Sequence, residues 1–337
     1  MRIGIVGIGA LGCLFAARLH MLAEVVMFGH WQEQIQTLRN EGLTYVDPDG
    51  KRRQIAVQVT DQPASADPVS VALILVKSYQ TQSAAEIASH ILESNGIALT
   101  LQNGLGNVET IAAAVGSERA VPGATTEGAT LEQPGVVRHA GAGTTYLGNP
   151  QAVNQELVKA TATLFNRAGF QTAVSESVDT VLWHKLIINA AINPLTAILD
   201  VPNGFLAEDS AARRLMTAAA QEAAQVAQAQ GIAIGNDDPG GMALDVARRT
   251  AQNSSSMRQD MRGGRPTEIE AISGSVVRLG RTCNMSTPFT QMLLQMVRLR
   301  QEGATHQELL KILGQEETIP QFSLLRQVLQ EVSDGSL

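Results

Sequence analysis

Cysteine is scarce in this sequence, with only Cys13 and Cys283 among 337 residues. Two thiols cannot supply a disulfide framework, so we expect a reducing, cytoplasmic setting. Basic side chains are also outnumbered, with 25 Lys and Arg against 32 Asp and Glu and a net charge of −7. A nucleic-acid-binding protein normally carries a basic excess, so we expect no nucleic-acid partner.

Long apolar runs and metal-ligand patterns are missing as well. No apolar run in the sequence has the length expected of a membrane-spanning helix, so we expect no membrane partner. The start, "MRIGIVGIGALG", could be compared with a signal peptide, but its glycine spacing favours a strand and a turn. The six His and two Cys show no metal-ligand spacing. We therefore expect no metal site.

The same N-terminal stretch predicts a dinucleotide-binding βαβ unit. A β-branched strand at 2–6 runs into Gly7, Gly9 and Gly12, which have the G-x-G-x-x-G spacing, before a helix at 11–22 and a strand at 24–29. The glycines permit a tight turn, close approach of a pyrophosphate and close helix–strand packing. The alternative is a plain strand-to-helix turn. The predicted cofactor loop consists of Gly7, Ile8, Gly9, Ala10, Leu11 and Gly12.

A carboxylate is absent where an NAD site usually has one. After the second strand the chain reads "FGHWQEQ", with no acid before Glu33, so the ribose 2′-OH has no expected partner and NADP is favoured. His30 could meet the 2′-phosphate or could be an ordinary loop residue, and no Arg follows this strand to form a bidentate clamp. Cys13, just inside the first helix, reads as a small packed residue more readily than as a redox group.

Further strands are expected at 71–76, 97–101 and 120–125, and a hairpin at 135–148. Ligands of open α/β sheets bind beyond the carboxyl ends of the strands. Lys77 and Asn103 follow two of these strands, so we expect both near the cofactor, although either could simply cap a helix.

Strand patterns fade after about residue 176 and helices replace them. A long helix at 177–199, which Pro194 would bend, is followed by predicted helices at 211–231, 240–264, 267–283 and 287–303. The fold class is therefore an α/β Rossmann-type N-terminal domain, residues 1–175, followed by an all-α C-terminal domain, residues 176–337, with a cleft between them.

One polar stripe interrupts the long helix. Lys185, Asn189 and Asn193 advance by about 40° per step of four residues and share one face, while the other positions are almost all apolar. An ammonium and two amides beside such a core cost several kcal/mol unless each finds a partner. The stripe either faces a functional cleft or consists of a snorkelling lysine and surface amides.

The order of motifs resembles the ketopantoate reductase family (2-dehydropantoate 2-reductase) to about residue 310. The shared motifs are "GIGALG", "VKSYQT", "QNGLGN", "WHKLIINAAINPLTAI", "PNG", "NSSSMRQDMRGGRPTEIEAISG" and "STPFT". The resemblance implies reduction of 2-dehydropantoate, a 2-keto acid, to (R)-pantoate by NADPH, on the route to pantothenate and coenzyme A.

The resemblance also implies roles for individual residues. Lys185 corresponds to the family's catalytic lysine and Glu268 to its active-site glutamate. Substrate contacts are implied for Asn103, Asn189, Asn193, Asn253 and Ser256, and cofactor contacts for Lys77, Asn103 and Glu268. His30 departs from the family pattern, because members often have Arg at that position for the 2′-phosphate.

Two other functions remain open from the sequence. One is a related NAD(P)-dependent reductase of another 2-keto acid, and the other is a dinucleotide-sensing protein without turnover. Beyond the resemblance, residues 319–337 predict an amphipathic helix. We expect it to pack on its own helical domain or on the second subunit of a homodimer.

Overall fold

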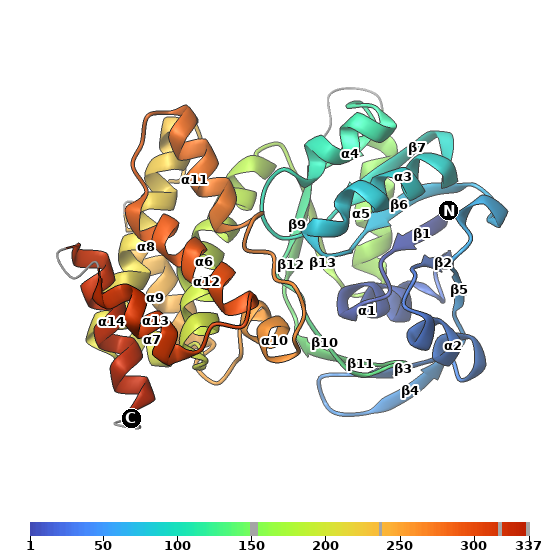
Figure 1. The fold of residues 1–337 in the computed structure, drawn as a ribbon. Coiled ribbons are helices and arrows are strands. Elements are labelled where there is room, and N and C mark those ends of the chain that lie inside the picture. The colour runs from blue at the N-terminus through green and yellow to red at the C-terminus, as the bar shows by residue number, and fades with distance from the viewer. Residues whose placement is uncertain (149–153, 236–237, 316–318, 335–337) are drawn as a thin grey trace. The chain divides into compact units, whose positions relative to one another are not determined.

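The computed structural model describes residues 1–148, 154–235, 238–315 and 319–334. It forms two compact units, Met1–Val181 and Leu182–Leu337. The division falls inside a helix, six residues beyond the boundary expected from the sequence. Each unit is described by itself below (Figure 1).

The first unit is built on a six-stranded sheet of order β5-β2-β1-β6-β7-β8, and all of its strand pairs are parallel. This is the order of a Rossmann fold, with the topological switch between β1 and β6. The strands are β1 (Arg2–Val6), β2 (Glu24–Phe28), β5 (Gln58–Thr60), β6 (Val69–Ile74), β7 (Leu92–Thr100) and β8 (Ala120–Val121).

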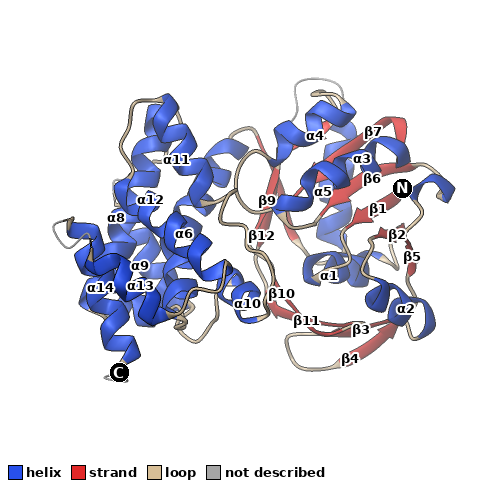
Figure 2. Cartoon of the chain, viewed as in Figure 1, coloured by secondary structure: helices blue, strands red, loops and turns tan. Residues whose placement is uncertain are grey.

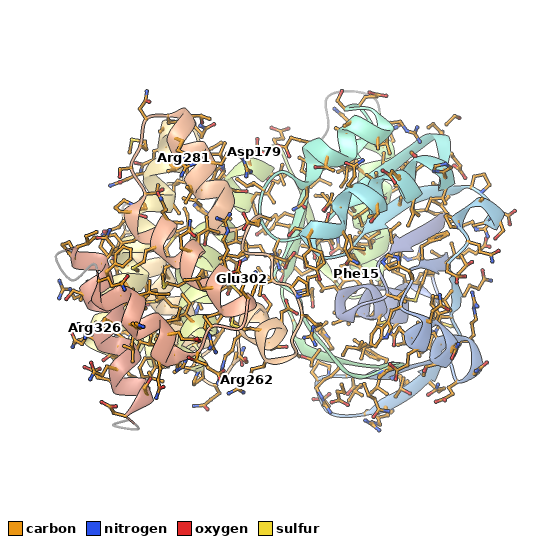
Figure 3. The ribbon with its side chains drawn as sticks, viewed as in Figure 1. Phe15, Asp179, Arg262, Arg281, Glu302 and Arg326 are labelled. Atoms are coloured by element: carbon orange, nitrogen blue, oxygen red, sulfur yellow. The ribbon has the colours of Figure 1, made fainter. Side chains whose placement is uncertain are left out.

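Helices cover both faces of this sheet (Figure 2), as a parallel sheet requires. Successive residues of β1 alternate between two apolar clusters, with Ile3 and Ile5 in one and Val6 in the other. On the first face, Phe15, which is labelled in Figure 3, stacks on Phe170 with ring centroids 4.2 Å apart. The helices are α1 (Ala10–Leu19), α2 (Gln32–Asn40), η1 (Pro63–Ser65), η2 (Ser78–Gln80), α3 (Thr81–Ile91), α4 (Asn107–Val115) and α5 (Gln155–Arg167).

Two smaller sheets complete the unit, with orders β10-β11-β3-β4 and β13-β12-β9. The hairpin expected at 135–148 is wrong. The strand at 136–141 lies between two others, so both of its edges are occupied, and the strand at 144–148 joins the other sheet. The strands are β3 (Leu43–Val46), β4 (Arg52–Ile55), β9 (Gly123–Thr125), β10 (Gly128–Gln133), β11 (Val136–Gly141), β12 (Thr144–Gly148) and β13 (Gln171–Ser175).

The single strand expected at 120–125 is also divided. Pro122 separates β8 from β9, and the two belong to different sheets. Proline has no N–H to donate to a ladder, which explains why the pairing changes at this residue.

The second unit is helical. The long helix α6 runs through Pro194 without interruption, and α8 packs against α7, α9, α11, α12 and α14. The helices are α6 (Val178–Leu199), α7 (Phe205–Glu208), α8 (Ser210–Ala229), α9 (Pro239–Arg249), α10 (Ser256–Arg262), α11 (Ser273–Thr282), α12 (Pro288–Gln301), α13 (His306–Gly314) and α14 (Pro320–Ser333).

Two of the predicted helices are wrong in extent. The helix expected at 240–264 is two helices, α9 and α10, because the backbone carbonyls of Ala251 and Asn253 accept from Gly204 and Asn203 instead of continuing a helical ladder. The helix expected at 267–283 begins only at Ser273. The residues before it form turns, in which the N–H of Thr267 donates to the side chain of Gln301.

The C-terminal helix α14 packs on α8, α12 and α13 of its own unit, so the first of the two expected packings is confirmed. Leu325, Val328 and Leu329 are its buried residues, and residues 335–337 of the predicted tail lie outside the described residues. In contrast to the sequence expectation, α6 has the length and composition of a membrane span. However, 67% of its apolar window is buried inside the structure, as in the core helix of a globular protein.

Candidate active site

The turn between β1 and α1 has the geometry of a phosphate-binding loop. Gly7 has φ of +124°, and a Cβ on Gly12 would lie 1.9 Å from the carbonyl oxygen of Gly7, so neither position accepts a side chain. Among the described residues other than its two chain neighbours, no atom lies within 4 Å of a Cβ built on Gly9. The backbone of Ile8, Ala10 and Leu11 completes the loop, and the first-turn N–H groups of α1 are available to an anion. The residues present therefore fit a pyrophosphate.

A buried glutamine that the sequence reading missed braces this loop. The side chain of Gln34 in α2 donates to the carbonyl of Ile8 (3.1 Å) and to the sulfur of Cys13 (3.3 Å), and accepts from the N–H of Gly135 (2.8 Å). Burial raises the pKa of the Cys13 thiol to about 12, although the bond from Gln34 opposes this shift. The thiol therefore stays protonated at neutral pH, which supports the packing interpretation of Cys13 over the redox one.

At the end of β2 the structure brings His30 and Gln80 together. Their Nε2 atoms lie 3.3 Å apart, and His30 is exposed. Ile8 packs over Gly29, where an added Cβ would lie 2.6 Å from the Ile8 side chain. Gln80 stands in the "VKSYQT" motif, but nothing in its sequence position indicated a contact with His30, which is 50 residues away.

Lys77 and Asn103 follow the neighbouring strands β6 and β7, as expected. Their loops are joined by a buried chain of side-chain hydrogen bonds, from Gln102 to Thr81 (2.9 Å) and from Thr81 to Asn107 (2.8 Å). The capping alternative fails for Asn103, whereas Lys77 does occupy the N-cap position of η2, although its side chain makes no capping hydrogen bond there. The N-cap of α4 is Gly106, not Asn103, and a lysine ammonium cannot accept a hydrogen bond as an N-cap does.

In the helical unit, the polar stripe of α6 is partly enclosed. Lys185 and Asn189 are half-buried, and Asn193 is 6% exposed. Burial lowers the pKa of Lys185 to about 8, and the negative charge of Glu268 opposes that shift. Glu268 is 5% exposed and lies in the turn before α11. The structure thus brings together these two residues, which are 83 positions apart in the sequence, as an electrostatic pair.

The remaining predicted residues lie at the start of α10. Asn253 and Ser256 are exposed, whereas Ser255 between them is buried and caps the helix through the N–H of Arg258. His184, which the sequence analysis set aside as structural, places its Nε2 2.5 Å from the carbonyl oxygen of Ile234. The sequence predicted Ser256 as a substrate contact, but it gave no indication of the buried hydrogen bonds of Ser255.

Comparison with known proteins identifies the group to which these features belong. The family model described as "Ketopantoate reductase PanE/ApbA" matches residues 3–152, and "Ketopantoate reductase PanE/ApbA C terminal" matches residues 177–301. The 2-dehydropantoate 2-reductase of Halobacterium salinarum is 37% identical over 302 residues, covering 89% of this chain and 99% of the relative. That of Archaeoglobus fulgidus is 32% identical, with 90% and 98% covered.

Solved structures agree. A D-mandelate dehydrogenase in ternary complex with NADH and anilino(oxo)acetate has a TM-score of 0.85 at 26% identity, covering 90% of this chain and 98% of that one. A PanE/ApbA family ketopantoate reductase from Ralstonia eutropha JMP134 has a TM-score of 0.82 at 28% identity, with 90% and 99% covered.

Together with the Rossmann sheet and its glycine loop, these likenesses define an oxidoreductase that uses a nicotinamide dinucleotide. Within that class, the chain belongs to the ketopantoate reductase family.

Proposed function

We propose that this protein reduces 2-dehydropantoate to (R)-pantoate with NADPH, in the cytoplasm, as a step toward pantothenate and coenzyme A. The observation that carries the proposal is the Lys185 ammonium, in the polar stripe of a largely apolar helix. Its pKa is lowered to about 8, with Glu268 nearby. A group with this pKa is still largely protonated at pH 7 and gives up its proton readily, as a general acid must.

The two units would supply different parts of the chemistry. The glycine loop of the first unit would hold the pyrophosphate, and Lys77, Asn103 and Glu268 would contact the cofactor, which supplies hydride to the keto carbon when bound. As negative charge develops on the keto oxygen, the Lys185 ammonium stabilises it and donates the proton. Asn189 and Asn193 would orient Lys185 or the substrate. Asn253 and Ser256 would donate hydrogen bonds to the carboxylate of the substrate.

The test is turnover by wild type and by Lys185→Ala. We expect wild type to oxidise NADPH when 2-dehydropantoate is present, and the variant to lose at least ~10²-fold in kcat, the usual scale for losing a general acid. Lys159→Ala serves as the control, since Lys159 is an exposed lysine on α5 paired with Glu156. A folded Lys185→Ala protein with near-normal kcat would remove Lys185 from the mechanism.

A second candidate is the reduction of a different 2-keto acid with NADH. Two observations favour it: the likeness to a D-mandelate dehydrogenase solved with NADH, and His30, with no arginine beside it, at the end of β2. NADPH should still be preferred, but modestly, because no carboxylate follows β2 to bind a free 2′-OH.

Kinetics with both cofactors, against 2-dehydropantoate and phenylglyoxylate, decide between the candidates. His30→Arg should lower KM for NADPH more than for NADH, because a guanidinium can bind the 2′-phosphate in a bidentate manner. Equal use of both cofactors by wild type, or higher kcat/KM for phenylglyoxylate, would favour the second candidate.

A further inference from the structure

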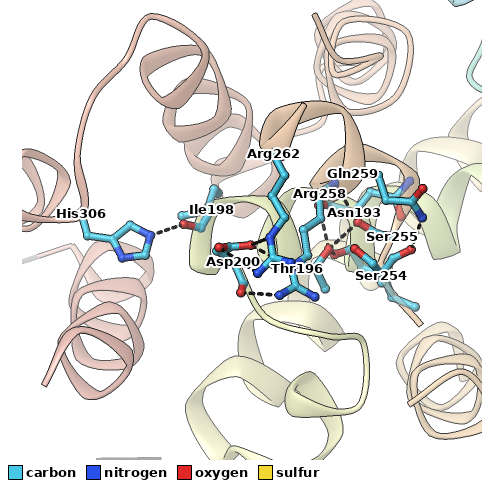
Figure 4. A network of polar contacts seen from close by, with 11 residues as sticks. Asn193, Thr196, Ile198, Asp200, Ser254, Ser255, Arg258, Gln259, Arg262 and His306 are labelled. Carbon is cyan, nitrogen blue, oxygen red and sulfur yellow. Dashed lines mark hydrogen bonds and ion pairs between the residues drawn. The ribbon is translucent and has the colours of Figure 1, made fainter. Parts of the chain in front are cut away.

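A buried contact between two hydroxyl groups joins α6 to the start of α10. Thr196 is fully buried, and its Oγ1 lies 2.7 Å from Oγ of Ser255 (Figure 4). The same Ser255 oxygen accepts from the N–H of Arg258 at 3.1 Å. Thr196 therefore contacts the cap of α10 directly.

A second contact attaches α10 to the chain just after α6, at Asp200, four residues beyond Thr196. Arg258 donates through Nε to the carboxylate of Asp200 (2.9 Å) and through Nη2 to the Asp200 carbonyl oxygen (2.7 Å). Asp200 has φ of +56°, a left-handed conformation that is uncommon outside glycine but that aspartate adopts more readily than most residues. Arg262 also binds the carboxylate, but its side chain is exposed whereas that of Arg258 is buried. In Figure 4 both guanidinium groups converge on Asp200.

The loop after α6 adds two more attachments. The N–H groups of Asn203 and Gly204 donate to the carbonyls of Asn253 (3.1 Å) and Ala251 (3.0 Å). A Cβ on Gly204 would lie 2.7 Å from the Ala251 side chain, so this approach depends on glycine. Residues 196–204 thus hold residues 251–258 at four points.

These attachments lie beside the residues proposed to bind the keto acid. Asn193 precedes Thr196 by three positions and lies on the same face of α6. Asn253 and Ser256 flank Ser255, and both are exposed, so their own side chains are not held by burial. Their position relative to Asn193 is therefore set by the backbone bond to Asn253 and by the side-chain contacts of Ser255 and Arg258.

We propose that Thr196 is a positioning residue, which holds Asn253 and Ser256 in register with Asn193 for binding of the substrate carboxylate. The Asp200–Arg258 pair supports the same register. This inference rests on the proposed function, because it assigns Thr196 a part in keto-acid binding and none in cofactor binding.

The Thr196 hydroxyl can be removed without depriving α6 of a needed bond. Its Oγ1 also lies 3.0 Å from the carbonyl oxygens of Ile192 and Asn193, contacts that a valine simply omits while keeping the branched shape. Thr196→Val therefore deletes the link to Ser255 with little change in volume, and Thr196→Ser restores a hydroxyl.

The experiment measures KM for 2-dehydropantoate, KM for NADPH, kcat and thermal stability in Thr196→Val, Thr196→Ser and Thr161→Val. Thr161 is an equally buried helical threonine, bonded to the Leu157 carbonyl in the first unit. Losing one buried hydrogen bond should raise KM for the keto acid about five- to tenfold in Thr196→Val. KM for NADPH should stay within about twofold, melting should match Thr161→Val, and Thr196→Ser should recover most of the affinity.

Arg258→Gln and Arg262→Gln form a second matched pair, since both remove a guanidinium from Asp200. Only the Arg258 variant should raise KM for the keto acid. An active wild type whose keto-acid KM is unchanged in Thr196→Val, or rises equally with KM for NADPH, overturns the inference alone. A wild type inactive on every 2-keto acid tested overturns the proposed function and this inference with it.

Discussion

At the scale of single residues, the lowered pKa of Lys185 predicts how kcat/KM depends on pH. Burial lowers this pKa from 10.5 to about 8, and Glu268 raises it from a still lower value. Only the protonated amine can donate, so kcat/KM should fall as pH rises through about 8. Glu268→Gln removes the opposing negative charge and should move this alkaline limb to lower pH. The measurement is a pH profile of kcat/KM for both proteins.

Glu270→Gln is the control for that profile. Glu270 stands two residues away in the same turn, but its carboxylate is exposed and pairs with Arg298 at 2.7 Å. This variant should keep the wild-type limb. If Glu268→Gln also keeps it, the charge of Glu268 does not act on the proton donor.

At the scale of elements, Gln34 connects α2, the glycine loop and the β10–β11 turn through buried hydrogen bonds. Gln34→Leu leaves the Gly135 N–H without its partner and loosens Ile8. It should cost about 1–3 kcal/mol of stability and raise KM for NADPH, while KM for the keto acid changes little. Thermal unfolding and steady-state kinetics test this.

Gln32→Leu, on the same helix but exposed, makes the same chemical change without touching the loop. Its stability and its KM for NADPH should both stay near wild type. Equal values of KM for NADPH in the two variants would mean that Gln34 stabilises α2 without shaping the cofactor loop.

Local signals explain which elements were predictable. The β1–α1–β2 unit follows from β-branched runs and glycine spacing within 30 residues, and the Lys185 stripe follows from helical periodicity. The break between α9 and α10 could not be predicted from local signals, because it depends on hydrogen bonds from Asn203 and Gly204, about 50 residues earlier. For the same reason, the Thr196–Ser255 contact, across 59 positions, has no counterpart in the sequence pattern.

At the scale of the whole molecule, the part of the helical core around α14 and the proposed catalytic residues lie on different helices and turns. The apolar face of α14 covers α8, α12 and α13, and none of these four helices carries a residue proposed here to bind substrate or cofactor. A change in this face should therefore alter stability without altering chemistry.

Leu329→Ala tests this separation, since Leu329 is fully buried. Removing its side chain leaves a cavity and should lower stability by about 2–5 kcal/mol, seen as a lower melting temperature. Gln330→Ala, the exposed neighbour on the same helix, should melt like wild type. Below its melting temperature, Leu329→Ala should keep wild-type kcat and KM for both substrates, because Lys185 and Glu268 lie on other elements. A folded Leu329→Ala protein with a reduced kcat would show that α14 acts on the active site through the helices beneath it.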